Sequence, residues 1–241
     1  INYPPAFLDK YIMLECLAER SGIDTFLVQD QEAVKYIAKC YDKGLWNIDK
    51  DNDVLSGVDH AGFPKQVDVF ENDEMCVVIR DYIEGESLYR YALENDLSIN
   101  DIVKICEQLC DVLSILHHRD KPIIHRDIKP SNIIVKSDGS IALIDFDIAR
   151  IWHSGNDTDT YFFGTVAYAP PEQYGFSQTD ARTDIYSLGI LLRYLLTGST
   201  RENKNIRLYR PLQKIINYGK QSSYPIKDYS NCVCLLSKWQ Q

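Results

Sequence analysis

The spacing of hydrophobic and polar residues changes along the chain and separates a strand-rich part from a helix-rich part. In the first third, β-prone runs at residues 25–28 and 34–40 flank the polar residues 29–32, and residues 76–79 form another apolar run. Short runs of this kind, bounded by polar residues, predict strands, the first two of them joined in a hairpin. From residue 98 the apolar positions follow a helical period, so the pattern predicts an α+β chain.

One long amphipathic helix is predicted after residue 98. Its apolar stripe, whose members are three or four residues apart, comprises Ile102, Ile105, Leu109, Val112 and Leu116. That spacing places all of them on one helix face. Ser98, with Asp101 three residues later, resembles a capping box, in which two side chains satisfy backbone N–H groups at the start of a helix.

Two further elements are predicted in the second half. Residues 132–135 and 141–144 are apolar runs on either side of the turn-forming residues 137–139, which predicts a hairpin. A buried helix is expected from about Asp184 to the sequence Thr197-Gly198. Its glycine can adopt the left-handed conformation that closes a helix.

Composition restricts the classes of protein that the chain can belong to. It has 241 residues, 45% of them hydrophobic and 25% charged, and a formal net charge of −9. These values exclude a disordered or collagen-like chain, and the net acidity argues against a nucleic-acid partner. The best candidate for a membrane span, residues 187–196, contains Arg193 and is shorter than the ~18 apolar residues required, so no membrane insertion is expected.

The number and spacing of the cysteines indicate whether the chain is expected in an oxidising or a reducing compartment. The seven cysteines are an odd number, and no two are spaced as Cys-x-x-Cys, so they predict neither a disulfide framework nor a zinc site. Cys106 and Cys110 are four residues apart, on one face of the predicted helix, and are expected to be buried thiols. We therefore expect a reducing, cytoplasmic location. No signal peptide is visible, and the sequence is compatible with the soluble part of a longer protein.

Two polar clusters stand at the outer ends of the second predicted hairpin. The segment 125–132 leads into its first strand, and the segment 145–147 follows its second. Because a hairpin brings its outer ends together, Asn132 and Asp145 are expected to lie within a few ångströms of each other. Hard oxygen ligands at that spacing suit Mg²⁺, which takes one or two carboxylates together with phosphate oxygens.

The first of these clusters also holds a carboxylate and an ammonium group close together. Asp127 and Lys129 are two residues apart in an irregular segment and are expected to face one pocket. Phosphoryl transfer needs such a pair, since one group orients the acceptor hydroxyl and the other offsets charge on the moving phosphoryl.

Four segments, in order, carry a resemblance to a known family. Residues 125–132 match the catalytic loop of protein kinases, and residues 145–147 stand where that family has Asp-Phe-Gly. Residues 169–172 resemble the motif that closes the activation segment, and residues 184–189 resemble the buried helix whose Asp braces the catalytic loop. The chain thus resembles the eukaryotic-like (Hanks-type) protein kinases. Its sequence over residues 165–189 is most similar to that of bacterial serine/threonine kinases.

The resemblance implies an α+β, bilobal protein-kinase-like fold. The small N-lobe would be mainly antiparallel β with one helix, and the larger C-lobe mainly α-helical. Residues 1–241 would form a single kinase domain, with the N-lobe at about 1–82, the hinge at about 81–85 and the C-lobe at about 86–241.

The same resemblance implies roles for individual residues of the C-lobe. Asp127 would accept or orient the proton of the substrate hydroxyl, and Lys129 would contact the γ-phosphate of ATP. Thr165 resembles the threonine that bonds both of them. Asn132 and Asp145 would hold Mg²⁺, with Mn²⁺ as the alternative ion.

In the N-lobe the resemblance implies a nucleotide site. Lys39 looks like the strand lysine that grips the α- and β-phosphates, with Lys35 as its rival. Asp51 stands where the family has the helix glutamate that pairs with this lysine. The backbone of Asp81 and Ile83 would read the adenine.

The sequence also departs from the family pattern at the glycine-rich loop, at the adenine site and in the Asp-Phe-Gly segment. The glycine-rich loop is missing, because Ala18, Arg20 and Ile23 occupy its glycine positions, although Arg20 could supply charge to the phosphates. Arg80 stands at the back of the adenine site, where a buried guanidinium needs an acidic partner such as Asp51 or Asp145. Asp147 replaces the glycine of Asp-Phe-Gly.

The activation segment would run from residue 145 to residue 172. It contains Thr158 and Thr160 in a polar loop, and Arg126 precedes the expected catalytic aspartate. In this family such an arginine often pairs with a phosphorylated loop residue. Thr158 and Thr160 are therefore the candidate regulatory phosphosites.

The leading expectation is an ATP-dependent protein serine/threonine kinase that phosphorylates a protein substrate and its own activation segment. The first alternative is a pseudokinase that holds a partner with little catalysis, which the missing glycines, Arg80 and Asp147 favour. The second is a small-molecule kinase of the aminoglycoside-phosphotransferase type, which also has a His-x-Asp…Asn loop. Dimerisation is compatible with the sequence but cannot be read from it.

Overall fold

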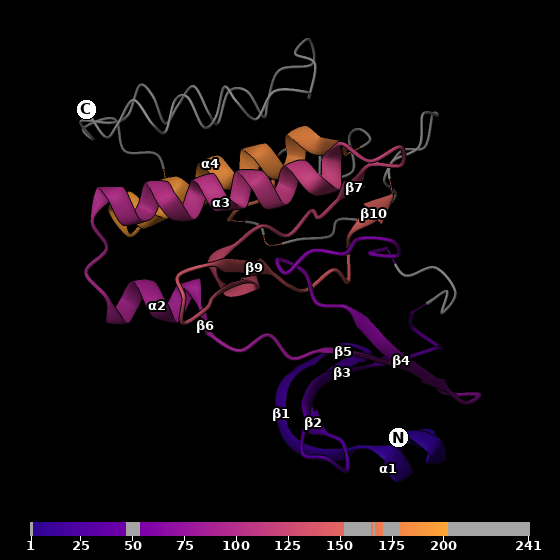
Figure 1. Cartoon of the computed structure of the whole chain (residues 1–241). Coiled ribbons are helices and arrows are strands. Elements are labelled where there is room, and N and C mark those ends of the chain that lie inside the picture. The colour runs from indigo at the N-terminus through magenta and orange to yellow at the C-terminus, as the bar shows by residue number, and fades with distance from the viewer. Residues whose placement is uncertain (1, 47–53, 152–164, 166, 171–178, 202–241) are drawn as a thin grey trace. The chain divides into compact units, whose positions relative to one another are not determined.

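A computed structural model of the chain describes residues 2–46, 54–151, 165, 167–170 and 179–201. The chain divides into two compact units, Ile1–Glu84 and Gly85–Gln241. Figure 1 shows strands predominating in the first unit and long helices in the second. This arrangement confirms the predicted α+β class, with an antiparallel sheet in the first unit.

The first unit is built on a five-stranded antiparallel sheet with the strand order β1-β2-β3-β5-β4. The strands are β1 (Ile12–Arg20), β2 (Ile23–Gln29), β3 (Lys35–Asp42), β4 (Gln66–Glu71) and β5 (Met75–Asp81). Three of them were predicted as shorter runs. The pattern missed the two edge strands, β1 and β4. Neither contains a fully buried residue, so that no clear alternation of buried and exposed positions marks them.

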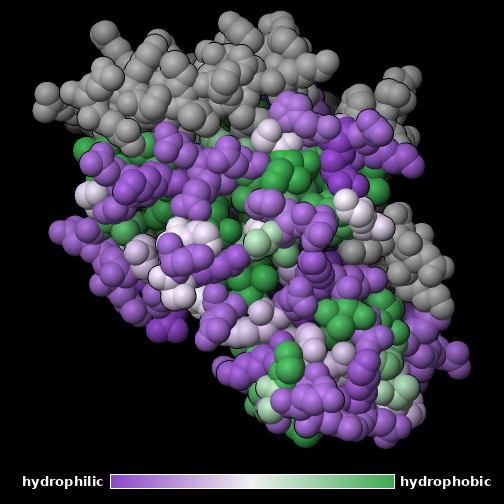
Figure 2. All heavy atoms as spheres, in the orientation of Figure 1, coloured by the Kyte–Doolittle hydropathy of each residue, from purple (hydrophilic) through white to green (hydrophobic). Residues whose placement is uncertain are grey.

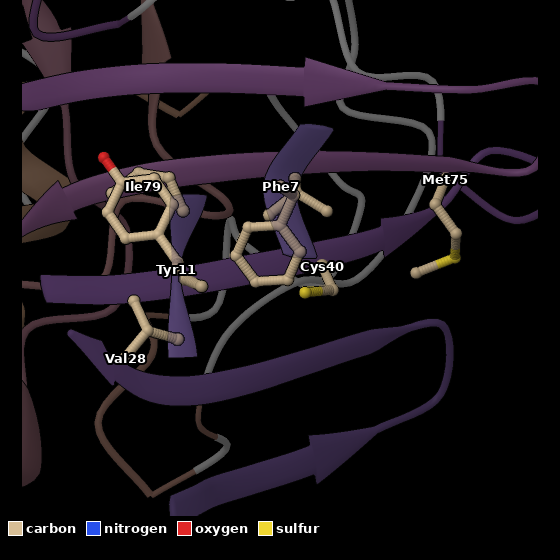
Figure 3. Close-up of a cluster of buried hydrophobic side chains, with 8 residues drawn as sticks. Phe7, Tyr11, Val28, Cys40, Met75 and Ile79 are labelled. Atoms are coloured by element: carbon tan, nitrogen blue, oxygen red, sulfur yellow. The ribbon is translucent and has the colours of Figure 1, made fainter. Parts of the chain in front are cut away.

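A short N-terminal helix, α1 (Pro5–Lys10), packs on one face of this sheet. Phe7 of α1 is fully buried, and Tyr11, which follows the helix, is almost so. Their rings stack with centroids 6.0 Å apart. Figure 3 shows both beside the sheet side chains Val28, Cys40 and Ile79. Burying a phenylalanine contributes about 1.5–3 kcal/mol, so α1 helps to hold this sheet together.

The described parts of the link between β3 and β4 form turns. Residues 43–46 and 54–65 contain no helix. A side chain in the first turn accepts hydrogen bonds, as Asp42 Oδ1 does from the N–H of Gly44 at 2.8 Å. The helix of the first unit that the structure does describe is therefore α1, at the N-terminus.

The second unit contains three helices and several short strands among its described residues. The helices are α2 (Leu88–Glu94), α3 (Ile99–His117) and α4 (Ala181–Thr197), and a 3₁₀ turn, η1, spans Pro130–Asn132. One sheet has the order β6-β8-β9, from β6 (Glu86–Ser87), β8 (Ile133–Val135) and β9 (Ile141–Leu143). A second pairs β7 (Ile123–Ile124) with β10 (Arg150–Ile151).

The predicted helix signals operate at the start of α3 and at the end of α4. At the start of α3, Ser98 and Asp101 form both hydrogen bonds of a capping box. At the start of α4, Asp180 accepts a hydrogen bond from the N–H of Arg182. This cap places the first residue at Ala181, three residues before the predicted start. The helix ends at Gly198, whose φ of 70° is left-handed, as predicted.

The hydrophobic core of the second unit lies where α3 and α4 pack side by side (Figure 1). The predicted stripe of α3 is confirmed, because all five of its members are buried. Cys106 and Cys110 are also fully buried on this helix, as predicted. The cysteines of the described residues are free thiols, and Cys16 is the exposed one among them.

Hydrophilic side chains predominate on the face of the molecule shown in Figure 2, with apolar patches between them. None of the helices in the described part of the chain is long and apolar enough to span a bilayer.

Candidate active site

A compact hydrogen-bond network joins four polar side chains of the second unit. Thr165 Oγ1 donates to Asp127 Oδ1 at 2.8 Å and accepts from Lys129 Nζ at 2.9 Å. Lys129 Nζ also donates to Asp127 Oδ2 at 2.5 Å. The Asn132 amide nitrogen donates to the same Oδ2 and to the Asp127 carbonyl, both at 2.9 Å. The structure thus brings together the three residues predicted to be catalytic and one predicted metal ligand.

The network is shielded from solvent but not sealed from it. The side chains of Asp127 and Lys129 are 7% and 14% exposed. Partial burial strengthens an ion pair and its hydrogen bonds relative to the same contacts in water. The carboxylate is therefore held in one orientation, with a cation fixed beside it.

The hairpin of β8 and β9 brings the second polar cluster to this network. Ile133 pairs with Leu143, and the N–H of Ile144 donates to the Asn132 carbonyl at 2.9 Å. Asp145 follows directly, so the predicted proximity of Asn132 and Asp145 holds for their backbones.

Two non-glycine residues of the site have left-handed backbone conformations. Arg126 has a φ of 71° and Asp145 a φ of 68°. Such a conformation costs an ordinary residue about 1–3 kcal/mol and persists only where the surrounding contacts impose it. Arg126 directly precedes Asp127, and Asp145 follows Ile144, whose N–H bonds the Asn132 carbonyl, which indicates that surrounding contacts hold both segments in place.

A buried carboxylate on α4 binds the backbone of residues 125 and 126, directly before Asp127. Asp184 Oδ1 accepts from the N–H of Arg126 at 2.8 Å, and Oδ2 accepts from the N–H of His125 at 2.9 Å. His117 Nε2 lies 2.8 Å from the same Oδ2. Burial alone would raise the pKa of Asp184, but the hydrogen bond and charge of His117 and the further contacts lower it overall.

The sequence analysis did not identify His117 as part of this site. His117 is buried, and its Nε2 is hydrogen-bonded to Asp184. The available signal was its position four residues after Leu113, which continues the buried side of α3.

His125 forms structural contacts within the site. Its Nε2 lies 3.1 Å from the Ile144 carbonyl, and its ring packs against Phe146 with centroids 4.6 Å apart. Burial lowers the pKa of His125 below its ordinary value of 6.5 despite the nearby carboxylates, so the neutral imidazole is favoured.

The donor set of the network suits a hard cation better than a soft one. The Asn132 amide nitrogen is committed to Asp127, which leaves its amide oxygen as the ligand atom, and Asp145 adds a carboxylate. Oxygen ligands of this type, few in number, are those of Mg²⁺ when phosphate supplies the others. Among the residues that the structure describes, no three His, Cys, Asp or Glu side chains cluster as a metal site.

In the first unit the two rival lysines have different environments. Lys39 lies in the middle of β3, opposite Thr25 and Val78 of the flanking strands, and is only 9% exposed. Lys35 begins the same strand and is exposed, with its Nζ 5.9 Å from the ring centre of Tyr82. Burying an ammonium group is unfavourable unless an opposite charge is paired with it. The buried position of Lys39 therefore favours it over Lys35 as the lysine that binds phosphate.

The loop that replaces the glycine-rich loop is a tight turn. Ala18 and Arg20 belong to β1 and pair with Thr25 and Ile23 of β2, so the tip consists of Ser21-Gly22. Gly22 has a φ of 79°, which favours glycine at this position. The Arg20 side chain is at the end of an exposed edge strand.

The expected adenine-reading residues lie at the end of β5, with Asp81 as its last residue and Ile83 two residues later. The N–H of Asp81 donates to the Lys65 carbonyl at 3.0 Å, and the Asp81 carboxylate accepts from the N–H of Lys65 at 3.3 Å. An adenine contact from Asp81 would therefore use its carbonyl oxygen, with Ile83 supplying the second backbone group. The remaining predicted residues, Asp51, Thr158 and Thr160, lie outside the described residues.

Comparison with known families identifies the class of protein to which this fold and this network belong. Residues 27–235 match the family described as "Protein kinase domain". The match covers most of the chain, and the chain belongs to this family. Members of the family generally use ATP and a divalent metal ion.

Particular relatives extend this result. The chain is 33% identical over 201 residues to "Serine/threonine-protein kinase 36" of Pongo abelii, covering 80% of this chain and 15% of that protein. It is 30% identical over 203 residues to "Probable serine/threonine-protein kinase PknB" of Lactococcus lactis, covering 80% of this chain and 32% of that protein. It is 37% identical over 145 residues to "Serine/threonine-protein kinase PrkC" of Bacillus subtilis, covering 59% and 22%.

These relatives confirm the resemblance to bacterial serine/threonine kinases and extend it to a mammalian protein. The chain spans about a third or less of the length of each relative. The family and the relatives support protein serine/threonine kinase activity and not the two alternatives.

Proposed function

We propose that this chain transfers the γ-phosphoryl group of Mg·ATP to a serine or threonine hydroxyl of a protein, and to its own activation segment. The observation that carries the proposal is the network of Asp127, Lys129, Thr165 and Asn132. It places a fixed carboxylate and a fixed ammonium group side by side, which is the pairing that phosphoryl transfer requires.

In the proposed reaction, the acceptor oxygen forms a bond to the γ-phosphorus while the bond from that phosphorus to the β,γ-bridging oxygen breaks, leaving ADP. The proton of the acceptor hydroxyl passes to the Asp127 carboxylate. Lys129, held between Asp127 and Thr165, offsets negative charge on the phosphoryl oxygens as they move. Thr165 holds the Asp127 carboxylate and the Lys129 ammonium group in fixed positions relative to each other.

Asn132 and Asp145 would hold the Mg²⁺ ion, with Mn²⁺ as the alternative. When bound, the ion neutralises charge on the β- and γ-phosphates. The protein side of this site is the hairpin of β8 and β9, which fixes the two ligand-bearing residues next to each other. The Asn132 side chain would therefore have two roles. Its amide nitrogen orients Asp127 toward the acceptor hydroxyl, and its amide oxygen would bind the ion.

The nucleotide would be held by residues of the first unit. Lys39 would bind the α- and β-phosphates, the backbone of Asp81 and Ile83 would read the adenine, and Arg20 would replace part of the missing glycine-rich cover. Burial of Lys39 in the middle of β3 supports this choice over Lys35.

The same proposal extends to the domain boundaries, the partner of Lys39, the regulatory phosphosites and the location of the protein. Residues 1–241 act as one kinase domain, with lobes at about 1–82 and 86–241 around a hinge at about 81–85. Asp51 pairs with Lys39, and Thr158 and Thr160 are regulatory phosphosites. The protein acts in the cytoplasm, which its free cysteines support, on a protein partner rather than a nucleic acid.

The test compares three proteins incubated with Mg·ATP: the wild type, Asp127→Asn and the control Asp111→Asn, whose residue is exposed on α3. Intact mass measures the phosphate that each gains. The proposal predicts phosphate on the wild type and the control but not on Asp127→Asn, with Thr158 or Thr160 among the sites. Equal phosphate on all three, or none on any, would contradict it.

A further inference from the structure

The tip of the β1–β2 hairpin, which follows Arg20 and stands where the family has its glycine-rich loop, is bonded to the residues at the end of β3. Trp46 Nε1 donates a hydrogen bond to the Ser21 carbonyl at 3.1 Å. The N–H of Asp42 donates to the Gly22 carbonyl at 2.9 Å. Both residues of the tip therefore have their carbonyl groups bonded to the same part of the chain. We call these two hydrogen bonds, together with the Trp46 side chain, the tryptophan latch.

Steric contact adds to the hydrogen bonds of the tryptophan latch. Gly22 has a φ of 79°, and a Cβ atom at this position would lie 2.9 Å from carbons of both Leu45 and Trp46. The two side chains thus pack directly on the backbone of the tip. The N–H groups of Leu45 and Trp46 donate to the Asp42 carbonyl at 3.1 and 2.8 Å, so a defined turn places them there. The tip is therefore held by packing as well as by hydrogen bonds.

Trp46 also belongs to the apolar cluster on one particular face of the sheet. Its ring meets that of Tyr41 edge to face, with centroids 6.5 Å apart. It packs against a cluster of buried side chains that includes Tyr41 and Val78. Val78 is the cross-strand partner of Lys39, and directly opposite residues lie on the same face of a sheet. The tryptophan latch therefore lies on the face that presents Lys39.

The register of the sheet connects the tryptophan latch to the proposed phosphate site. Thr25 lies opposite Lys39, and Ala18 lies opposite Thr25, so these residues form one row across three strands. Neighbouring strands are about 4.8 Å apart, which places the Ala18 backbone about 10 Å from that of Lys39. Arg20, at the end of β1, directly precedes Ser21 of the tip. The latch thus fixes the backbone of the segment proposed to cover the phosphates that Lys39 binds.

We infer that Trp46 is a positioning residue for the nucleotide, because it holds the β1–β2 hairpin in one conformation beside the proposed phosphate site. This inference rests on the proposed function, since the site that Trp46 positions is the proposed ATP site. Glycines let a backbone approach phosphates closely, and this hairpin has Ala18 and Arg20 instead. Ordering such a hairpin only when the nucleotide binds would cost conformational entropy and weaken binding. The tryptophan latch orders the hairpin before the nucleotide arrives.

The test compares the whole wild-type chain with Trp46→Phe, which keeps an aromatic ring but cannot donate to the Ser21 carbonyl. Calorimetry in the presence of Mg²⁺ gives the Kd for ATP, and steady-state kinetics give the KM for a serine peptide. The net contribution of one hydrogen bond corresponds to about a 3- to 10-fold change in affinity. We expect Trp46→Phe to raise the Kd for ATP by that factor and to leave the KM for the peptide unchanged.

Tyr11→Phe is the matched control, because it also removes one side-chain hydrogen bond and keeps an aromatic ring. Tyr11 donates to Asp68 at 3.3 Å and packs in the cluster on the face that carries α1. Its Kd for ATP should equal that of the wild type. Hydrogen exchange of the backbone amides of residues 18–24 should be faster in Trp46→Phe and unchanged in Tyr11→Phe. Thermal unfolding checks that both variants remain folded.

The other outcomes separate this inference from the proposed function. A Kd for ATP that is unchanged in Trp46→Phe would overturn the inference even if residues 18–24 exchange faster, because the latch would then stabilise the hairpin without positioning the nucleotide. Equal weakening in Tyr11→Phe would also overturn it, since the effect would belong to the sheet as a whole. No binding of ATP by the wild type would instead contradict the proposed function, and this inference with it.

Discussion

Replacing Asp184 with asparagine should remove the brace that holds the catalytic loop, with little change in volume. The carboxylate is fully buried and accepts from the N–H groups of His125 and Arg126, with His117 as its third partner. An amide has one accepting oxygen and presents an NH₂ group at the other position. At least one of the three hydrogen bonds is therefore lost, whichever way the amide is oriented.

The magnitude follows from the number of hydrogen bonds lost. A hydrogen bond to a charged group contributes about 1.5–3 kcal/mol, and a buried N–H left without an acceptor adds to the cost. We therefore expect Asp184→Asn to lower the free energy of unfolding by about 2–5 kcal/mol. The matched control, Asp111→Asn on the exposed side of α3, should stay within about 0.5 kcal/mol of the wild type.

The pH dependence of this difference provides an independent check. The pKa of Asp184 is lowered in the folded protein from its ordinary value of 3.8. Its contribution to stability is therefore complete above pH 3.8 and is lost as the pH falls through the lower, folded value. The gap between wild type and Asp184→Asn should persist from neutral pH down to about pH 5 and shrink only below pH 4.

Urea denaturation followed by circular dichroism measures these free energies at each pH. Phosphotransfer should fall as well, because Arg126 and His125 lead directly into Asp127. The reasoning would be refuted by an Asp184→Asn variant as stable as Asp111→Asn, or by a stability gap that already closes between pH 7 and pH 5.

Three further predictions concern other parts of the chain. Thr165→Val should lower kcat about 10- to 100-fold through loss of two hydrogen bonds, with nearly unchanged melting temperature; an unchanged kcat would remove Thr165 from the site. Lys39→Met should weaken ATP binding, measured by calorimetry, far more than Lys35→Met. The free energy of unfolding of the wild type should fall by up to about 1.4 kcal/mol per pH unit below pH 6.5, because His125 takes up a proton in the unfolded chain but not in its buried, folded position. Urea titrations of His125→Asn should show a smaller slope.

The elements that local pattern specifies were predictable from the sequence. Ser98 and Asp101 capped the long helix as expected, and Gly198 closed α4. The hairpin turn formed where Asp138 and Gly139 supply turn chemistry, with Asp138 Oδ1 accepting from the N–H of Ser140 at 2.8 Å. In each case the determining contacts lie within a few residues, so the sequence contains them.

Elements that depend on distant contacts were not predictable in this way. The sequence does not indicate that α1 packs on the sheet, because Phe7 meets residues of β2, β3 and β5 only in the folded unit. The sequence analysis gave His117 no role at the site, because its partner, Asp184, is 67 residues away. Similarly, Thr165 was assigned by family resemblance, since nothing local connects it with Lys129, 36 residues earlier. The left-handed backbone at Asp145 is imposed by tertiary contacts that no local pattern shows.

The most direct test of kinase function follows the γ-phosphoryl group itself. The purified chain is given Mg²⁺ and ATP labelled at either the γ- or the α-phosphate, together with a serine peptide, the same peptide with alanine in place of serine, or an aminoglycoside. Our account predicts label on the serine peptide from γ-labelled ATP alone, and none with Asp127→Asn. Label on the aminoglycoside but not the peptide, or no transfer to any acceptor, would contradict it.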